Sequence, residues 1–251
     1  MTASRPEPDP EAATTGPEPE PATADEDALP PGLPVRVRQA LGAAAAALGL
    51  AVVALSYAVA QGSPGRWEAT VVRGAAGVWD VVGVPARVVM QLGTAGGVAA
   101  IAVVTGWVAA RTEAERPTPS PASARSPWRR ALAGPRLPAV AVLAGGLLSL
   151  LVCNRFKGLV ERPRPVNVRL REAQDGFGYP SSHTATAFGA AVVLTFLVPR
   201  RWRWAPLTVA AVVGLTRMHV GVHYPLDVVG GALIGLAVGL AVVAVLDPSR
   251  R

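Results

Sequence analysis

Three short stretches of the sequence contain residue types that could act together on a phosphate group. They run over 157–165, 179–183 and 216–227. Between them they supply three cations, a hydroxyl, two histidines and a carboxylate, namely Lys157, Arg164, Arg217, Ser181, His183, His223 and Asp227.

This set of groups suits the transfer of a phosphoryl group. A phosphate monoester carries close to two negative charges, and fixed guanidinium, ammonium and helix N-terminal groups stabilise the charge on its oxygens. A histidine can attack phosphorus, and a carboxylate can hold that histidine in the right tautomer. A second histidine can protonate the leaving alkoxide and later activate water. No cluster of Asp, Glu and His has the spacing of a divalent-metal site, so we expect no metal and no cofactor.

Each residue also has a simpler explanation when it is taken alone. Lys157 and Arg164 flank the end of an apolar segment, where basic side chains commonly reach toward the membrane surface. Ser181 precedes a helical segment, and a role as N-cap alone would explain it. Asp227 follows Pro225 in a first helical turn, where an acid suits the helix dipole.

Arg217 and the histidines are harder to explain by packing. Arg217 lies within an apolar segment, and an arginine costs up to about 3 kcal/mol near the centre of a membrane. An ionisable residue in such a segment needs a partner or a function. All three histidines of the chain fall in the second and third stretches. Of these, His219 fits a packing or interfacial role better than a catalytic one.

Long apolar segments must position the three stretches. Hydrophobic residues make up 51% of the chain and come in uncharged blocks, which is typical of a membrane protein. Six such segments run over about 40–60, 88–110, 137–153, 184–198, 205–222 and 228–246. Because a bilayer leaves the backbone few alternatives to helix, we predict an all-α polytopic membrane protein with about six transmembrane helices. The three stretches then lie at successive span ends on one face.

The charge distribution favours a lipid environment. The net charge is +7, and the bases lie between apolar blocks, which favours anionic lipid over nucleic acid as a partner. Arginines near the span ends favour a cytoplasmic N-terminus, which places the three stretches on the extracytoplasmic face of a bacterial plasma membrane. The basic cluster over 155–171 breaks this rule, and a function at that face would explain it. The single cysteine, Cys153, excludes an intrachain disulfide.

At these stretches the sequence resembles the type 2 phosphatidic acid phosphatase superfamily. The family pattern is Lys-x6-Arg-Pro, Pro-Ser-Gly-His and Ser-Arg-x5-His-x3-Asp. The corresponding residues here are Lys157 with Arg164-Pro165, then Pro180-Ser181-Ser182-His183, then Thr216-Arg217 with His223 and Asp227. Every spacing within the three motifs matches. Ser182 in place of glycine and Thr216 in place of serine depart from the pattern, and the first departure affects backbone donors near the phosphate.

The resemblance implies a role for each matched residue. His223 is implied to be the nucleophile, with Asp227 orienting it, and His183 the general acid and base. The substrate phosphate is implied to be bound by a clamp of cations with help from the serines, that is, by Lys157, Arg164, Arg217, Ser181 and Ser182. The implied enzyme is a metal-independent membrane phosphatase that hydrolyses a lipid phosphate or diphosphate through a phospho-histidine intermediate.

The composition divides the chain into four predicted parts. Residues 1–34 hold eight acids and one arginine among many prolines, so we expect a disordered cytoplasmic tail. The range 35–87 contains the first transmembrane helix and an interfacial segment with Trp67 and Trp79. The phosphatase core covers 88–247, and 248–251 is a short cytoplasmic tail.

Two other functions fit parts of the same evidence. A lipid phosphotransferase would use the same residues and pass the phosphoryl group to an acceptor other than water. A non-catalytic lipid-binding membrane protein would need only the anion pocket, and the intact His183, His223 and Asp227 argue against it. A vanadate-dependent haloperoxidase of the same superfamily is disfavoured by the six apolar segments and the short chain.

Glycerolipid and polyprenyl phosphates both fit the predicted site as substrates, and we expect a polyprenyl carrier of envelope synthesis. The residues predict no oligomeric state.

Overall fold

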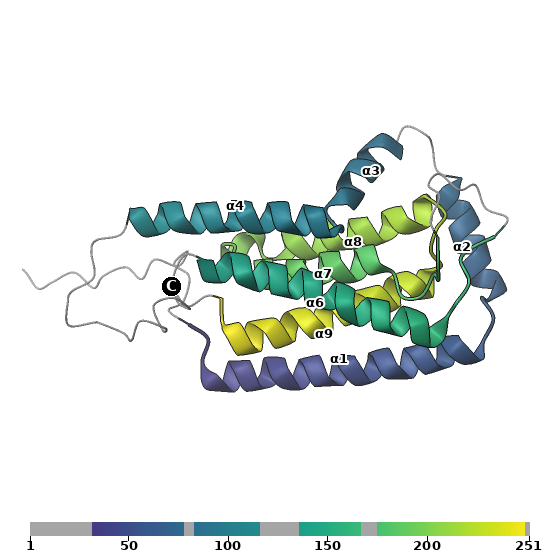
Figure 1. Ribbon diagram of the computed structural model, residues 1–251, viewed down its shortest axis with the longest axis horizontal. Coiled ribbons are helices and arrows are strands. Elements are labelled where there is room, and N and C mark those ends of the chain that lie inside the picture. Colours follow the sequence, from purple (N-terminus) through teal and green to yellow (C-terminus); the bar gives the residue numbers. More distant parts are fainter. Residues whose placement is uncertain (1–31, 78–82, 116–135, 167–174, 249–251) are drawn as a thin grey trace, which may run out of the picture.

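The computed structural model describes residues 32–77, 83–115, 136–166 and 175–248, and within these ranges the fold is all-α (Figure 1). The helices, in chain order, are α1 (Val35–Gln61), α2 (Arg66–Ala76), α3 (Gly83–Gln91), α4 (Ala95–Ala114), α6 (Arg136–Val160), α7 (Ser182–Thr195), the 3-10 helix η3 (Arg200–Trp202), α8 (Trp204–His219) and α9 (Pro225–Leu246). The predicted all-α class is therefore confirmed for the described residues.

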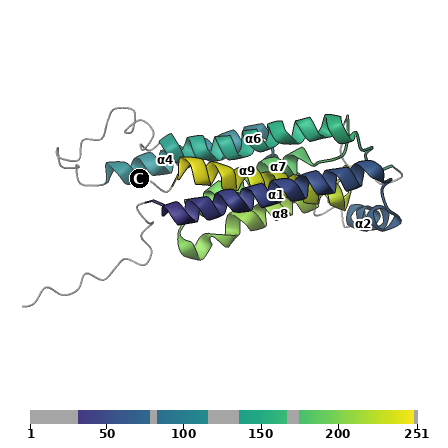
Figure 2. The same ribbon diagram turned by 90° about the horizontal axis from the view of Figure 1, so that it is seen from below.

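The long helices run side by side, with α7 in the centre of the bundle (Figures 1 and 2). Helix α7 packs against α6, α8 and α9, and α1 packs along α9. The start of α1 lies beside the end of α9, where Asp247 Oδ2 accepts a 3.0 Å hydrogen bond from the Leu33 amide and Arg38 Nε donates to the Ala244 carbonyl at 2.6 Å. The loops after α6 and α8 lie at the opposite end of the bundle.

Small residues let α7 and α9 approach closely. Gly231, Gly235 and Gly239 repeat every four residues of α9 and therefore share one face of that helix. A Cβ atom added at Gly235 would lie 2.5 Å from the Ala185 carbonyl oxygen of α7. Helix α7 carries the second predicted stretch and α9 carries Asp227, so this contact sets the distance between two parts of the predicted site.

Within the part of the chain that the structure describes, four helices are long and apolar enough to cross a membrane, namely α1, α4, α6 and α9. Helices α7 and α8 have 14 and 16 residues, so the prediction of about six transmembrane helices is not confirmed. The predicted segment 88–110 is also divided, because α3 ends at Gln91 and Thr94 caps a new helix by accepting a 3.0 Å hydrogen bond from the Gly97 amide. That segment is therefore not one continuous span.

The predicted interfacial segment contains helix α2, which runs across the end of the bundle (Figures 1 and 2). Its face formed by Glu68, Val72 and Ala76 is buried, whereas Trp67 is 55% exposed. Trp79 and nearly all of the predicted tail over 1–34 lie outside the described residues. The predicted division of the chain into four parts and the interfacial position of α2 stay predictions.

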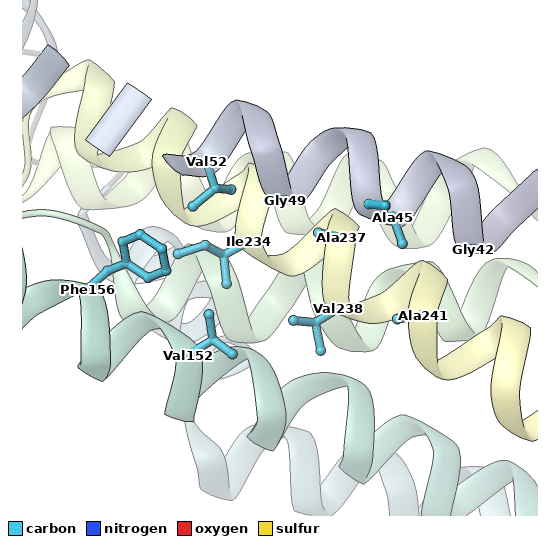
Figure 3. A pocket seen from close by; sticks show the side chains of 11 residues that line it. Gly42, Ala45, Gly49, Val52, Val152, Phe156, Ile234, Ala237, Val238 and Ala241 are labelled. Carbon is cyan, nitrogen blue, oxygen red and sulfur yellow. The ribbon is translucent and has the colours of Figure 1, made fainter. Parts of the chain in front are cut away.

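An apolar groove of about 400 Å³ lies between α1, α6 and α9 (Figure 3). Gly42 and Gly49 of α1 form one wall, and Phe156 and Val152 of α6 form another. Only small or aliphatic side chains of α9 reach it, including Ile234. The groove thus lies among three of the four helices that could cross a membrane.

Candidate active site

A cavity of about 200 Å³ lies at the end of the bundle covered by α2 and brings the three predicted stretches together. Its wall consists of side chains from α6, α7 and the loops after α6 and α8, namely Lys157, Arg164, Asp175, Gly176, Phe177, Ser182, His183 and His223. Five of the eight predicted site residues line it. Ser181, Arg217 and Asp227 lie behind the wall and are fully buried.

The two basic residues of the first stretch are held by backbone carbonyls. Lys157, in the last turn of α6, donates a 2.8 Å hydrogen bond to the Phe177 carbonyl. Arg164 donates from Nε to the Gly176 carbonyl at 2.9 Å and from Nη1 to the Val222 carbonyl at 3.0 Å. These contacts fix the two cations at the cavity and join the loops that follow α6 and α8.

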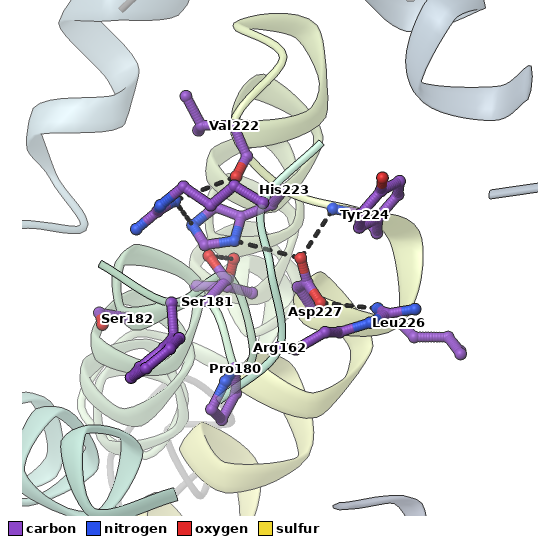
Figure 4. A network of polar contacts seen from close by, with 12 residues as sticks. Arg162, Pro180, Ser181, Ser182, Val222, His223, Tyr224, Leu226 and Asp227 are labelled. Atoms are coloured by element: carbon purple, nitrogen blue, oxygen red, sulfur yellow. Dashed lines mark hydrogen bonds and ion pairs between the residues drawn. The ribbon is translucent and has the colours of Figure 1, made fainter. Parts of the chain in front are cut away.

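His223 lies between a base and an acid (Figure 4). Its Nε2 atom is 3.5 Å from Arg164 Nη1, and its Nδ1 atom is 3.5 Å from Asp227 Oδ2. The Asp227 carboxylate favours the tautomer with hydrogen on Nδ1, which leaves the Nε2 lone pair available. Burial lowers the pKa of His223 to about 4, with Asp227 opposing the shift, so the imidazole is neutral at pH 7.

The junction of α8 and α9 explains this arrangement. Gly221 has a φ of +81°, a conformation that favours glycine, and the turn returns the chain toward the start of α9. Pro225 occupies the first turn of α9, where its missing N–H costs nothing. Asp227 caps the helix by accepting a 2.8 Å hydrogen bond from the Tyr224 amide with Oδ2. The same oxygen is the one nearest to His223.

The start of α7 joins the second stretch to the third. The Ser181 amide donates a 2.9 Å hydrogen bond to the Asp227 carbonyl, and its Oγ accepts one from Thr184 Oγ1 at 2.9 Å. Its side chain does not accept a capping bond from the α7 backbone. Ser182 lines the cavity, and its Oγ lies 3.6 Å from Cys153 Sγ. Of the two predicted serines, only Ser182 is therefore at the cavity surface.

Arg217 lies in the last turn of α8, and its guanidinium contacts the Met90 sulfur of α3 through Nη1. His219, two residues further along the same helix, is hydrogen-bonded through Nδ1 to the Ala75 carbonyl of α2 at 2.9 Å. His219 thus has a packing role in the contact between α2 and α8, and Arg217 lies just behind the cavity wall. The assigned roles of all eight residues stay predictions.

Two residues next to the site were not predicted. Arg162 donates from Nη1 to Asp227 Oδ1 at 2.8 Å and from Nη2 to Glu68 Oε2 at 2.6 Å. Arg162 belongs to the first stretch but does not match a family position. Glu68 lies on the same face of the amphipathic helix α2 as Val72 and Ala76, where an acid is unusual. This position is the signal in the sequence that could have identified Glu68.

A metal site would require a different set of residues. Across the ranges that the structure describes, no group of three or more His, Cys, Asp and Glu side chains is placed to hold a metal ion. The cavity instead has Lys157 and Arg164 beside the two histidines. Independence from metal stays a prediction.

Known proteins show similarity in both sequence and fold. The PAP2 superfamily model matches residues 138–251. The chain is 38% identical over 96 residues to a lipid A 4'-phosphatase of Bacteroides thetaiotaomicron, which is 34% of this chain and 43% of that protein. It is 31% identical over 106 residues to the undecaprenyl-diphosphatase BcrC of Bacillus subtilis, or 39% of this chain and 54% of that one. It is 33% identical over 116 residues to a decaprenylphosphoryl-5-phosphoribose phosphatase of Mycobacterium tuberculosis, which is 43% of this chain and 61% of that protein.

The fold is similar to that of two solved structures. A PAP2 type phosphatidylglycerolphosphate phosphatase from Bacillus subtilis superimposes with a TM-score of 0.62 and 19% identity over 79% of this chain and 93% of that chain. LpxE of Aquifex aeolicus superimposes with a TM-score of 0.54 and 21% identity over 69% of this chain and 93% of that chain. The matched part of this chain spans about half of the curated relatives above. The family match begins at residue 138, so the predicted core range of 88–247 stays a prediction. The resemblance found in the three motifs is confirmed: residues 138–251 of this membrane protein match the PAP2 superfamily.

Proposed function

We propose that the protein is a membrane phosphatase that hydrolyses a lipid phosphate or diphosphate through a phospho-histidine intermediate. The observation that carries the proposal is the position of His223, between Arg164 and Asp227 in the wall of a cavity that also contains Lys157 and His183. The relatives support the class of substrate, because their names describe phosphatases of lipid A, undecaprenyl diphosphate and a decaprenyl-linked phosphoribose.

In the first step, His223 Nε2 attacks the phosphorus atom. A P–N bond forms while the P–O bond to the leaving group breaks. His183, which takes up a proton when the phosphate anion binds beside it, gives that proton to the leaving oxygen. The ring of His223 gains positive charge, which the Asp227 carboxylate stabilises through Nδ1–H. Lys157 and Arg164 bind the phosphate oxygens.

In the second step, water replaces the histidine. Neutral His183 accepts a proton from water as the water oxygen attacks phosphorus, and the P–N bond breaks to return the electron pair to His223. Inorganic phosphate is released and both histidines regain their starting protonation states. We assign Ser182 to phosphate binding at the cavity, and Ser181 and Arg217 to the layer behind it that supports the binding groups.

We further propose that the cavity faces the extracytoplasmic side and that the N-terminus is cytoplasmic. Trp107 lies against Arg111 at 4.6 Å near the end of α4 distant from the cavity, and Trp202, at the end of η3, contacts Trp204, at the start of α8. Tryptophans mark both membrane surfaces, and arginines near span ends are in excess on the cytoplasmic side, so the arginines favour this orientation. An impermeant thiol reagent should label a Cys introduced at exposed Glu161 in intact cells, whereas a Cys at exposed Arg200 should react only after lysis. The reverse result would contradict the orientation. Native Cys153 is buried and gives little background.

The test of function is phosphate release by purified protein in detergent from a panel of lipids. The panel contains phosphatidic acid, phosphatidylglycerol phosphate and polyprenyl mono- and diphosphates, and we expect release to be greatest with a polyprenyl substrate. His223→Ala should abolish release, whereas His219→Gln, which changes the histidine outside the cavity, should retain most of it. Release by folded His223→Ala protein at the wild-type rate would refute the mechanism. No release from any lipid by the wild-type protein would favour the non-catalytic lipid-binding function, and phosphorylation of an added acceptor would indicate a phosphotransferase.

A further inference from the structure

A buried chain of charged groups connects helix α2 to the proposed nucleophile. Glu68 Oε2 accepts a 2.6 Å hydrogen bond from Arg162 Nη2, and Asp227 Oδ1 accepts one of 2.8 Å from Arg162 Nη1. The other carboxylate oxygen of Asp227 lies 3.5 Å from His223 Nδ1. One guanidinium therefore joins two carboxylates, and the second carboxylate contacts the imidazole. Figure 4 shows the part of this chain from Arg162 through Asp227 to His223.

The chain is closed to solvent and separate from the cavity. Glu68 is 2% exposed, Arg162 is 4% exposed and Asp227 is fully buried. None of the three lines the cavity where the substrate phosphate would bind. A buried ion network of this kind is costly to desolvate and is weak evidence for stability alone, which directs attention to a functional reason for keeping it.

Further contacts hold Glu68 in one orientation. Its Oε2 accepts a 3.1 Å hydrogen bond from the Gly65 amide, and its Oε1 accepts one of 3.3 Å from the Leu226 amide at the start of α9. Glu161, with a φ of +50°, ends α6 and turns the chain immediately before Arg162. The Arg162 guanidinium also lies over the Tyr224 ring at 5.0 Å. Three elements distant in sequence thus converge on the Asp227 carboxylate.

We infer that Glu68 and Arg162 are positioning residues that act through Asp227 on His223, so that helix α2, which precedes the matched family region, completes the active site. The inference rests on the proposed function of His223. Neither residue touches the substrate in this inference. Each sets the position and the effective charge of the Asp227 carboxylate.

The physical reason is the sharing of one positive charge between two carboxylates. With Glu68 present, the group of Glu68, Arg162 and Asp227 carries a net charge of −1, and Asp227 keeps negative charge to stabilise the ring of His223 as it gains the phosphoryl group. Without Glu68, Arg162 pairs with Asp227 alone and neutralises it. Without Arg162, the two carboxylates repel each other and the Asp227 carboxylate loses its anchor.

The kinetic test compares Glu68→Gln and Arg162→Met with matched controls at exposed positions, Glu113→Gln and Arg66→Met. We expect kcat to fall about tenfold to a hundredfold in both test variants, the size that loss of a charge-assisted hydrogen bond gives, with KM within about twofold of wild type. The controls should match wild type. Arg162→Lys, which keeps the charge but not the two-sided guanidinium, serves if Arg162→Met does not fold. Test variants that retain wild-type kcat when folded would overturn the inference.

A second readout distinguishes positioning from support of the fold. The other charged and titratable groups around His223 come from every neighbouring element and are present in both variants: Lys157, Arg164, His183, Arg217 and Asp227. Removing the negative charge of Glu68 should move the acid limb of kcat/KM to lower pH, whereas removing the positive charge of Arg162 should move it to higher pH. A purely structural role would lower the folded fraction and leave the limb unmoved in the remaining protein. Shifts in the same direction, or none, would refute the inference.

The same opposite shifts can be measured without any enzymatic activity. The chain has three histidines, so 15N-histidine NMR gives few imidazole signals, and loss of one signal in His223→Gln assigns that ring. Glu68→Gln should lower the pKa of His223 and Arg162→Met should raise it. If wild-type protein hydrolyses no lipid but these shifts occur, the proposed function fails while the coupling stands. If wild-type protein is active and the shifts are absent, the coupling fails alone.

Discussion

Replacing Gly231 with alanine should move apart two halves of the active site. A Cβ atom at this position of α9 would lie 2.5 Å from the Ser181 carbonyl oxygen and 3.1 Å from Thr184 Cβ. Ordinary contact begins at 3.4 Å, so the start of α7 must shift by about 0.9 Å. The obstacle is backbone of α7 and cannot rotate away.

The magnitude of the effect follows from that shift. Overpacking of this kind costs about 1–3 kcal/mol of stability. A displacement near 1 Å between reacting groups can cost about a hundredfold in rate. His183 follows Ser181 by two residues and Asp227 precedes Gly231 by four, so the shift acts on the distance between the proposed acid and the partner of His223. We expect Gly231→Ala to melt at lower temperature and to lose tenfold or more of kcat.

The assay is phosphate release by purified protein, combined with a thermal melt in the same detergent. Gly42→Ala in α1 is the matched control, because a Cβ atom there meets nothing within 4 Å. It should keep full activity and should not lower the melting temperature, since alanine favours helix over glycine. A Gly231→Ala protein with wild-type activity and stability would show that the close contact between α7 and α9 does not position the site.

Four other predictions follow from the proposed site and mechanism. Asp227→Asn should lower kcat about a thousandfold or more in phosphate-release assays, because the amide favours the wrong tautomer of His223 and cannot balance its charge; a loss below tenfold would contradict the assigned role. Because the pKa of His223 is lowered from 6.5 to about 4, the neutral ring persists as pH falls below 6.5. The acid limb of kcat/KM, where the rate falls as His223 is protonated, should therefore appear only near pH 4. The same shift should make stability constant above pH 6.5 and lower as pH falls from 6.5 through 4, measured by thermal melts. Excess EDTA should leave phosphate release unchanged, and loss of activity that added Mg²⁺ or Zn²⁺ restores would contradict the metal-independent mechanism.

The sequence predicted that the site residues lie together, because the three motifs fall at the ends of apolar segments. Few arrangements of a helical bundle place those ends on different faces. Lys157 lies in the last turn of α6, His183 lies in the first turn of α7 and His223 precedes α9, so the corresponding helix ends had to meet at one face. The four-residue spacing of His223 and Asp227 places the carboxylate one turn into α9, next to the imidazole. The sequence did not separate residues at the cavity surface from those behind it, because Ser181 and Ser182 are adjacent and differ only in the direction of their side chains.

The contacts of α2 could not be predicted in the same way. Glu68 and Arg162 are 94 residues apart, and no local spacing links a helix after the first span to a loop after α6. Their pairing depends on how α2 lies across the bundle, which tertiary packing decides. An acid on the buried face of α2 needs a partner, but the sequence does not indicate which of the many arginines it is.

The division of the predicted segment 88–110 shows why apolar composition alone misplaced a span. Hydropathy treats this segment as one block, yet Gly93 and Thr94 lie near its start, and glycine followed by threonine is typical of a helix boundary. The boundary has a packing reason, since a Cβ atom at Gly93 would lie 2.6 Å from the His183 carbonyl oxygen. The chain between α3 and α4 therefore approaches the backbone of a proposed catalytic residue, and an uninterrupted helix with a larger residue at 93 would occupy the space of α7. The interruption of the apolar segment and the position of His183 are thus two consequences of one close backbone contact.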